Sequence, residues 1–420
     1  MYTLAGIARS PLRLPAFRRF WIGQTVSTLG DQFTTIALLW FVLQLTGSGI
    51  AVGTVLLCFY LPGIVSSPLL GRLLDRYQPR LLMSADNLGR ACLIGAIPAL
   101  HWLGLLSLWM VYALALLVGV LSPATSVGTR VLLPHLVTDS ELDGANALLS
   151  VSITAPTLVG PAFAGVLVSI IGGPPVLLID AASFLVMAVA LYLLPDVSRT
   201  HQPRENPTGK SWFGFRDLMD LKEVRILTLL SLVFFVAYWP LEPALPIYSR
   251  NVLQAGASGF GLLWSAFGVG ALLGLLLIPW LSKRPRPGVT FATIALLWGL
   301  LLVPMVFIHN LIAAMVLFAL AACAWGPYTT IETSLLQRLV PAHQRGRVFG
   351  AQGTLMTATA PAGLFAGGIL LEHISAPEVI GLSGIACVAV GIAGLLSPRL
   401  RRVKRVEMEA QIELASTERA

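Results

Sequence analysis

Six ionisable side chains lie inside long apolar stretches of the sequence, and any chemistry of this chain has to start from them. They are Asp31, Asp86, Arg90, Asp180, Glu242 and Glu332. If these stretches cross a bilayer, each charge costs roughly 2.5–3.5 kcal/mol even on the mild insertion scale. Each group therefore needs a partner, a proton or an aqueous cavity.

Catalytic and metal-binding patterns are missing from the sequence. The six His residues are scattered, the four Cys residues are isolated, and neither an H-E-x-x-H pattern nor an ATP-binding loop occurs. The sequence therefore predicts neither an enzyme, nor a metal site, nor a bound cofactor.

Asp31 is the strongest candidate for a proton-responsive site. Gln24, Thr28, Asp31 and Thr35 recur at helical spacing and form one polar stripe. Such a stripe faces an aqueous cavity or another helix. No basic residue lies near Asp31 in the sequence, so a proton is a ready way to neutralise its carboxylate. The alternative is a carboxylate capped by neighbouring hydroxyl groups.

Asp86 and Arg90 are four residues apart, which places them on one face of a helix. We predict that they form a structural ion pair. Asp180 falls near the outer end of its apolar stretch, where its carboxylate could reach the membrane interface.

Glu242 and Glu332 are the two further candidates for proton coupling. Pro240 and Pro243 flank Glu242 and predict a broken helix that exposes backbone groups to a cavity. Aromatic side chains near the two acids could form walls for a bulky, partly cationic or amphiphilic substrate, and core packing is the alternative for each. They are Tyr238, Trp239, Trp325 and Tyr328.

The elements that must position these residues are membrane-spanning helices. The chain is 56% hydrophobic and 11% charged, whereas soluble domains carry about 25% charged residues. A span needs roughly 20 apolar residues. Twelve such spans are predicted, and they leave no room for a soluble domain. They cover residues 17–45, 49–71, 81–101, 105–129, 144–172, 174–195, 225–249, 257–281, 287–308, 311–336, 347–372 and 377–397.

The basic residues set the predicted orientation. With the N-terminus inside, nearly all of the 28 Lys and Arg residues fall on the cytoplasmic side, the exceptions being Arg90 and Arg250. Both termini are therefore expected in the cytoplasm of a cell whose inner membrane the chain crosses many times. The net charge of +8 is explained by this topology and by attraction to anionic lipids. No basic groove with interleaved aromatics predicts nucleic-acid binding.

The sequence repeats itself at a spacing slightly above 200 residues. Pro123-Ala-Thr corresponds to Pro327-Tyr-Thr, and Thr154-Ala-Pro corresponds to Thr359-Ala-Pro. Duplicated halves of this kind are typical of secondary transporters. We predict an N-terminal six-helix half, a cytoplasmic linker with an interfacial helix over Trp212–Glu223, a C-terminal six-helix half, and a basic tail that anchors to headgroups. These parts cover residues 1–195, 196–224, 225–398 and 399–420.

Two motifs resemble signatures of the major facilitator superfamily. Gly71, Asp75, Arg76 and Arg80 match its G-x-x-x-D-R-x-G-R-R loop, although Gln78 and Pro79 depart from the pattern. The resemblance implies a gate that latches the outward-facing state.

The second motif, Gly160-Pro161-Ala-Phe-Ala164-Gly165, resembles the antiporter element G-P-x-x-G-G, with Ala164 at one glycine. It implies a seal between the halves and export of the substrate. Ordinary packing of small residues is the alternative.

The opening stretch, Phe17 to Gln24 and Ser27 to Asp31, resembles the macrolide-efflux and enterobactin-exporter-like branch of that superfamily. The resemblance implies an all-α membrane protein of twelve helices in two halves. Helices 1, 4, 7 and 10 line its cavity, and Asp31, Glu242 and Glu332 fall on three of them. We therefore expect a monomeric proton-coupled exporter, or antiporter, that moves small amphiphilic compounds such as drugs or siderophore-like metabolites by alternating access. The expected partners are the small-molecule substrate, protons and membrane lipids. Sodium coupling, an importer, a lipid flippase and a non-transporting membrane sensor stay open.

Overall fold

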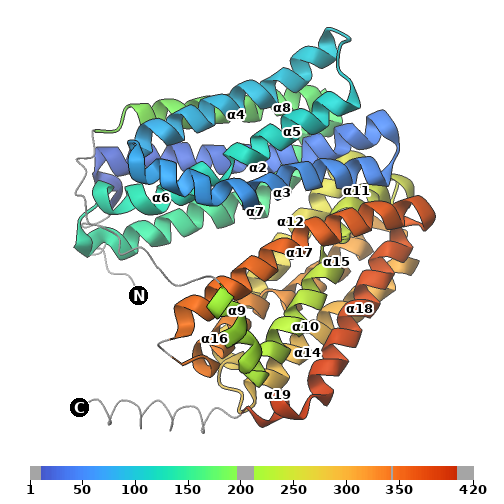
Figure 1. Cartoon of the computed structure of the whole chain (residues 1–420). Helices are drawn as coiled ribbons and strands as arrows, with labels where there is room; N and C mark the ends of the chain where they lie inside the picture. The colour runs from blue at the N-terminus through green and yellow to red at the C-terminus, as the bar shows by residue number, and fades with distance from the viewer. Residues whose placement is uncertain (1–10, 196–211, 342–343, 404–420) are drawn as a thin grey trace. The chain divides into compact units, whose positions relative to one another are not determined.

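The computed structural model describes residues 11–195, 212–341 and 344–403 (Figure 1). Within these ranges the chain is built from helices joined by short turns. It divides into two compact units, of which unit 1 takes in residues 1–202 and 254–265, and unit 2 takes in residues 203–253 and 266–420.

Each unit has its own set of helices. Unit 1 contains η1 (Pro11–Arg13), α2 (Pro15–Thr46), α3 (Gly49–Arg76), α4 (Pro79–Trp102), α5 (Leu108–Leu121), α6 (Pro123–Leu136), η2 (Asp139–Glu141), α7 (Leu142–Ile171) and α8 (Gly173–Tyr192). Unit 2 contains α9 (Trp212–Asp220), α10 (Lys222–Tyr238), α11 (Leu241–Asn251), α13 (Ile278–Leu281), α14 (Pro287–Leu302), η3 (Val303–Phe307), α15 (Leu311–Trp325), α16 (Tyr328–Leu339), α17 (Arg345–His373), α18 (Ala376–Leu396) and α19 (Pro398–Arg402). Helix α12 (Gly256–Leu275) begins in unit 1 and continues in unit 2.

Eleven helical segments among the described residues are long and apolar enough to cross a membrane. The third predicted span corresponds to α4, which is not one of the eleven. Its 24 residues are still long enough for about 36 Å at 1.5 Å per residue. Asp86, Asn87 and Arg90 are all buried in this helix, and they make it more polar than its neighbours.

Three of the predicted spans are each built from two helices that meet beside a proline. The breaks fall between α5 and α6 at Pro123, between α10 and α11 at Pro240, and between α15 and α16 at Pro327. Proline has no amide hydrogen, and its ring clashes with the carbonyl group four residues earlier. The predicted break beside Glu242 is confirmed. The other two breaks fall at Pro123 and Pro327, which correspond to each other in the repeated sequence of the two halves.

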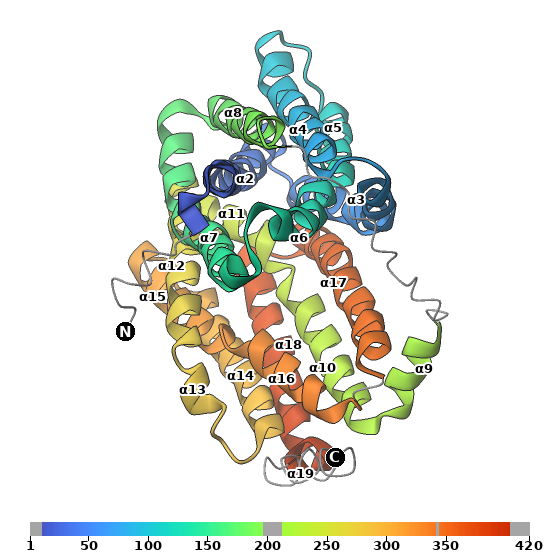
Figure 2. The ribbon, with the colours of Figure 1, turned by 90° about the vertical axis from the view of Figure 1, so that its left-hand side faces the viewer.

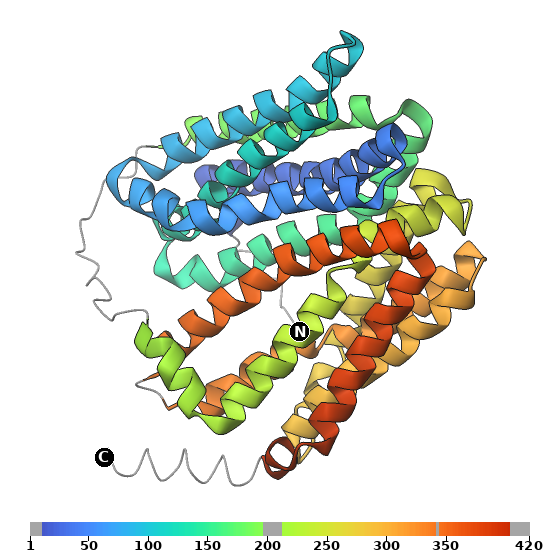
Figure 3. The same cartoon turned by 45° about the vertical axis from the view of Figure 1, so that its right-hand side comes forward.

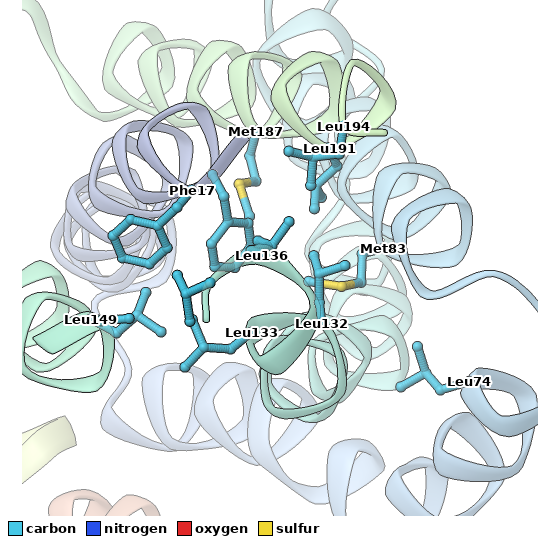
Figure 4. Close-up of a cluster of buried hydrophobic side chains, with 13 residues drawn as sticks. Phe17, Leu74, Met83, Leu132, Leu133, Leu136, Leu149, Met187, Leu191 and Leu194 are labelled. Carbon is cyan, nitrogen blue, oxygen red and sulfur yellow. The ribbon is translucent and has the colours of Figure 1, made fainter. Parts of the chain in front are cut away.

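Helix α2 is the central element of unit 1. It packs along α8 and α7, and α4 packs along α8 (Figures 1 and 2). A cluster of buried apolar side chains joins these helices to α3 and α6 (Figure 4). In lipid such a cluster is stabilised mainly by close packing, because apolar side chains gain little by leaving hydrocarbon. It includes Phe17, Phe20, Met83, Leu132, Leu136, Met187 and Leu191.

Unit 2 is held by helices that approach closely at small residues. Figure 3 shows α18, in red, alongside the yellow-green α10, and α18 also packs along α14. Gly299 of α14 faces Gly384 of α18, and a Cβ atom added at Gly299 would lie 2.6 Å from the amide nitrogen of Val388. Glycine at this crossing lets the two backbones touch.

The helix that the sequence predicts over Trp212–Glu223 is found as α9, which ends at Asp220. It packs on α17, where Arg347 Nη2 lies 3.1 Å from Asp217 Oδ2. The linker start at residues 196–211 and the tail at residues 404–420 lie outside the described residues.

We expect Gly299→Ala to lower the free energy of unfolding by about 1–3 kcal/mol, because the added methyl group overpacks a backbone contact that cannot move aside. Thermal unfolding of the purified chain in detergent measures the change. Gly350→Ala on α17 is the matched control, since a Cβ atom there meets no described atom within 4 Å. Equal stability of the two variants would mean that α14 and α18 leave room between them.

Candidate functional site

A buried ion pair joins two helices of unit 1. Arg90 of α4 donates from Nη2 to Asp31 Oδ1 of α2 over 2.7 Å. The guanidinium carbon of Arg90 also lies 4.0 Å from the ring centroid of Phe184 on α8. The Arg90 side chain is 6% exposed, whereas that of Asp31 is 37% exposed. The guanidinium group of Arg90 is therefore enclosed by protein, whereas part of the Asp31 side chain stays accessible.

This pairing differs from the one that the sequence predicts. Arg90 pairs with Asp31 and not with Asp86, which instead accepts a hydrogen bond of 2.7 Å from Thr125 Oγ1 of α6. Asp86 Oδ1 and Arg90 Nε have no hydrogen-bond partner among the described residues. A neighbour four residues away gains only about 0.2–0.5 kcal/mol on a helix surface. The long Arg90 side chain reaches across to the facing helix, so Asp31 has a base as its partner although none lies near it in the sequence.

Asp180 forms a second carboxylate site in unit 1. It is fully buried on α8 and does not reach the interface that the sequence predicts. Its two oxygens accept hydrogen bonds from Thr34 Oγ1 at 2.5 Å and from Ser183 Oγ at 2.8 Å. A Cβ atom at Gly30 would overlap both Ser183 and Asp180, so glycine at this point of α2 is what makes room for the group.

The other hydroxyl and amide groups of the polar stripe on α2 donate within the helix, while Gln24 Oε1 is buried without a partner among the described residues. Gln24 Nε2 donates to Thr28 Oγ1 over 3.2 Å, and Thr28 Oγ1 donates to the Gln24 carbonyl oxygen over 2.8 Å. Thr35 Oγ1 donates to the carbonyl oxygen of Asp31 over 2.9 Å, not to its carboxylate. The partner that the structure gives the Asp31 carboxylate is therefore a guanidinium group and not a hydroxyl cap.

Glu242 lies beside an aromatic cluster in unit 2. It occupies the first turn of α11, directly after the break that ends α10, and its Oε2 is buried without a partner among the described residues. One turn earlier, the Tyr238 ring stacks on Trp325 of α15 with centroids 5.8 Å apart and planes 14° apart. Trp239 Nε1 donates to Thr359 Oγ1 of α17 over 3.1 Å. Tyr238 and Trp325 therefore stack on each other close to the helix break that carries Glu242.

Tyr328 and Glu332 belong to the packing of α16. Tyr328 is fully buried, stacks on Phe234 with centroids 4.3 Å apart, and donates a hydrogen bond to Ser231 Oγ over 3.2 Å. These contacts make Tyr328 a core residue. Glu332 is 6% exposed and accepts a hydrogen bond of 3.0 Å from Gln352 Nε2 of α17. It holds α16 to α17.

The loop motif after α3 has a structural partner in α8. Arg80 Nη1 donates to the carbonyl oxygen of Leu194, just beyond the last residue of α8. Carbonyl groups at a helix end lack partners within the helix, and a cation there also suits the helix dipole. Gly71 faces open space among the described atoms, and the Arg76 guanidinium lies 5.9 Å from the Tyr77 ring centroid. The Asp75 side chain lies outside the part that the structure describes.

The glycine and proline motif of α7 packs against two helices. A Cβ atom at Gly160 would lie 2.7 Å from Gln32 Cβ of α2, and one at Gly165 would lie 2.5 Å from the Ala257 carbonyl oxygen of α12. Next to Pro161, the amide of Ala162 donates to Ser265 Oγ of α12 over 2.9 Å. These contacts lie within unit 1, and small residues are required for them.

Several proteins of known name align with nearly the whole chain. Two proteins named multidrug efflux pump Tap each align with 94% of it. The one from Mycolicibacterium fortuitum is 26% identical over 97% of its own length, and the one from Mycobacterium tuberculosis is 27% identical over 96%. The MFS-type transporter y4rN of Sinorhizobium fredii is 27% identical, and the alignment covers 93% of this chain and 96% of that protein.

Solved structures share the fold. A mutant of the nucleoside transporter NupG superposes with a TM-score of 0.73 at 14% identity, covering 90% of this chain and 99% of that one. A bacterial homologue of the iron transporter ferroportin superposes with a TM-score of 0.70 at 17% identity, covering 91% and 98%. At these identities the likeness concerns the fold alone.

The family model described as the Major Facilitator Superfamily matches residues 20–364, which is most of the chain. The resemblance predicted from the sequence motifs is thereby confirmed at the level of the superfamily. With its membrane-spanning helices and with transporters as relatives over nearly its whole length, this chain is a multi-pass membrane protein that belongs to the Major Facilitator Superfamily of transporters.

Proposed function

We propose that this protein is a proton-coupled exporter of small amphiphilic compounds, such as drugs, that works by alternating access. The observation that carries the proposal is the ion pair between Asp31 and Arg90 inside unit 1. The two multidrug efflux pumps that align with 94% of the chain support the direction and the class of substrate.

The ion pair suits proton exchange because its two members differ in exposure. Arg90 is enclosed by α2, α4 and α8, and a charge at membrane depth is costly without a partner. Asp31 keeps 37% of its side-chain surface open, so a proton or a cationic substrate can approach it from that face. A proton on Asp31 removes the counter-charge of Arg90.

Asp86 is placed to receive the guanidinium group that a proton on Asp31 releases. It lies one turn before Arg90 on α4 and holds a buried oxygen without a partner among the described residues. Arg90 holds an unpartnered Nε in the same part of the helix. A move of Arg90 from Asp31 to Asp86 therefore satisfies both atoms and keeps the base paired throughout the cycle.

The balance of charge in unit 1 also favours a mobile cation. Asp31, Asp86 and Asp180 are three carboxylates, and Arg90 can neutralise one of them. Burying the others as anions is expensive, so the cluster needs further positive charge. Protons and cationic amphiphiles can both supply it, and competition between them is the basis of antiport.

Unit 2 contributes the groups that suit an amphiphilic substrate. The faces of Tyr238 and Trp325 attract flat apolar rings and organic cations, and the buried oxygen of Glu242 can pair with a positive charge. Glu242 is thus a candidate for recognition as well as for proton coupling, whereas Tyr328 and Glu332 serve mainly to pack α16.

We further propose the organisation that goes with this function. Two six-helix halves over residues 1–195 and 225–398 rock about the site, both termini face the cytoplasm, and a monomer suffices in the inner membrane. Gly71, Asp75, Arg76 and Arg80 gate the inner side, and Gly160, Pro161 and Gly165 form the antiporter element. The repeated sequence and the distribution of Lys and Arg support this arrangement.

Asp31→Asn is expected to abolish pH-driven accumulation of ethidium in everted vesicles, because the amide cannot gain or lose the coupling proton. Downhill ethidium exchange in the absence of a pH gradient should persist. Asp143→Asn, a change of an exposed acid at the start of α7, is the matched control and should leave accumulation unchanged. Full accumulation by Asp31→Asn would exclude this residue as the coupling site, and no pH-driven movement by the unaltered chain would overturn the proposed function.

A double-mutant cycle should find Asp31 and Arg90 coupled by about 1–3 kcal/mol in the free energy of unfolding. Asp31→Asn leaves the enclosed Arg90 without its counter-charge, Arg90→Gln leaves the half-buried Asp31 without its own, and the double change removes both charges. Denaturant unfolding in mixed micelles measures the cycle. The more exposed pair Asp217 and Arg347, treated in the same way, should give at most about 1 kcal/mol. Equal coupling in both pairs would contradict an important role for the buried one.

Glu242→Gln is expected to raise the concentration for half-maximal ethidium transport by about tenfold, which corresponds to about 1.4 kcal/mol of lost binding free energy. For chloramphenicol, a neutral amphiphile, the concentration for half-maximal transport should change less than twofold, because this compound has no positive charge to pair with Glu242. Glu378→Gln, at an exposed helix start on α18, serves as the control. If the concentration for half-maximal transport rises equally for ethidium and chloramphenicol, Glu242 does not recognise the positive charge of the substrate.

A further inference from the structure

A groove opens on unit 2 at the beginning of α14. It has a volume of about 500 Å³ and lies between α13, α14 and the junction of α15 and α16. This volume is within the range of small-molecule sites, roughly 300–1,000 Å³. Most of its walls are apolar, and they include Leu277, Trp280, Leu281, Val289, Ile294 and Leu297.

A second hollow of about 330 Å³ adjoins the groove at Arg286, which lines both. It is lined by Arg286, Pro398, Arg401 and Arg402. A Cβ atom at Gly288 of α14 would overlap the carbonyl oxygen of Leu400 on α19. Glycine therefore brings the start of α14 against α19, and this contact places arginines from two elements around one hollow. Figure 2 shows α13, α14 and α19 at the same end of unit 2.

The arginines of this region have no acidic partner in the part of the chain that the structure describes. No ion pair joins Arg284, Arg286, Arg401 or Arg402 to a described carboxylate. The Arg284 guanidinium carbon instead lies 3.7 Å from the ring centroid of Trp280. A group of like charges held without a counter-charge favours an anion from outside, and guanidinium groups suit phosphate in particular.

The apolar surface beside the arginines decides which anion fits. Trp280 is 57% exposed and Leu276 is 74% exposed, and both come directly after the candidate membrane span Gly256–Leu275. Tryptophan and arginine side by side are typical of the level where lipid headgroups meet acyl chains. A free phosphate ion would leave the groove of about 500 Å³ unused. A lipid with an acyl chain and a phosphate group fills both parts.

We propose that this groove and its arginine hollow form a binding site for one anionic phospholipid. The phosphate group and the headgroup lie against Arg286, Arg401 and Arg402, and an acyl chain lies along the groove past Trp280 and Thr293. The bound lipid bridges α14 and α19. The inference does not depend on the proposed transport function, because lipid binding is measured on the purified chain without any transport.

Native mass spectrometry of the full-length chain, titrated with phosphatidylglycerol, phosphatidylcholine or inorganic phosphate, tests the proposal. Retention of one phosphatidylglycerol in preference to phosphatidylcholine is expected, with no competition from inorganic phosphate. Arg401→Gln should weaken phosphatidylglycerol binding roughly fivefold, and the combination with Arg286→Gln roughly 25-fold, as expected for one charge each near a lipid headgroup. Thr293→Phe, which fills the groove, should weaken it as well.

Arg399→Gln is the matched control. It removes the same charge from the same helix, and Arg399, which is exposed like Arg401, lines neither hollow. Its binding of phosphatidylglycerol should stay within twofold of that of the unaltered chain, by the same electrostatic reasoning. An equal loss in Arg399→Gln would reduce the site to diffuse surface charge. Displacement by inorganic phosphate would make it a free-anion site, and equal retention of phosphatidylcholine would remove the preference for charge. Each of these results overturns the proposal, as does unchanged binding in Arg401→Gln.

Discussion

The pairing of Arg90 with Asp31 is the interaction on which unit 1 depends. A guanidinium group at membrane depth cannot lose its proton, so it must always have a partner. Here the partner comes from α2, and the ring of Phe184 on α8 covers the other side. The three helices that form the centre of the unit therefore meet at one charged side chain.

The sequence predicts eleven of the twelve spans and the helix break beside Glu242, because apolar length and a proline both act locally. Apolar length determines a span, and the prolines at 123, 240 and 327 interrupt helices through their own backbone. The partner of Arg90 could not be predicted in this way. The spacing along α4 favours Asp86 as the partner of Arg90. The actual partner, Asp31, lies on α2, and no local sequence pattern shows that α2 packs next to α4. The prediction that Asp180 reaches the membrane interface was wrong for the same reason. The sequence shows where Asp180 lies along its own span, but it does not show that Thr34 of α2 faces it.

Aromatic residues near the acids posed a different problem. Cavity walls and core packing use the same residue types, so the sequence left both open for Tyr238, Trp325 and Tyr328. The structure assigns Tyr328 to the core. Tyr328 is enclosed by Phe234 and Ser231, while Tyr238 and Trp325 stack beside an acid whose oxygen has no described partner. The unpartnered Glu242 oxygen supports the proposal that Tyr238 and Trp325 belong to a binding surface.

The polar character of α4 has a consequence for the synthesis of the protein. The other spans among the described residues are apolar enough to partition into the bilayer by themselves, but α4 carries Asp86, Asn87 and Arg90. Such a segment is costly in the bilayer, and pairing of Arg90 with Asp31 of α2 lowers that cost. Since α2 precedes α4 in the chain, Asp31 has already been synthesised when α4 emerges, and it is available to pair with Arg90. We therefore expect the ion pair to link the membrane insertion of α4 to a helix that is made before it.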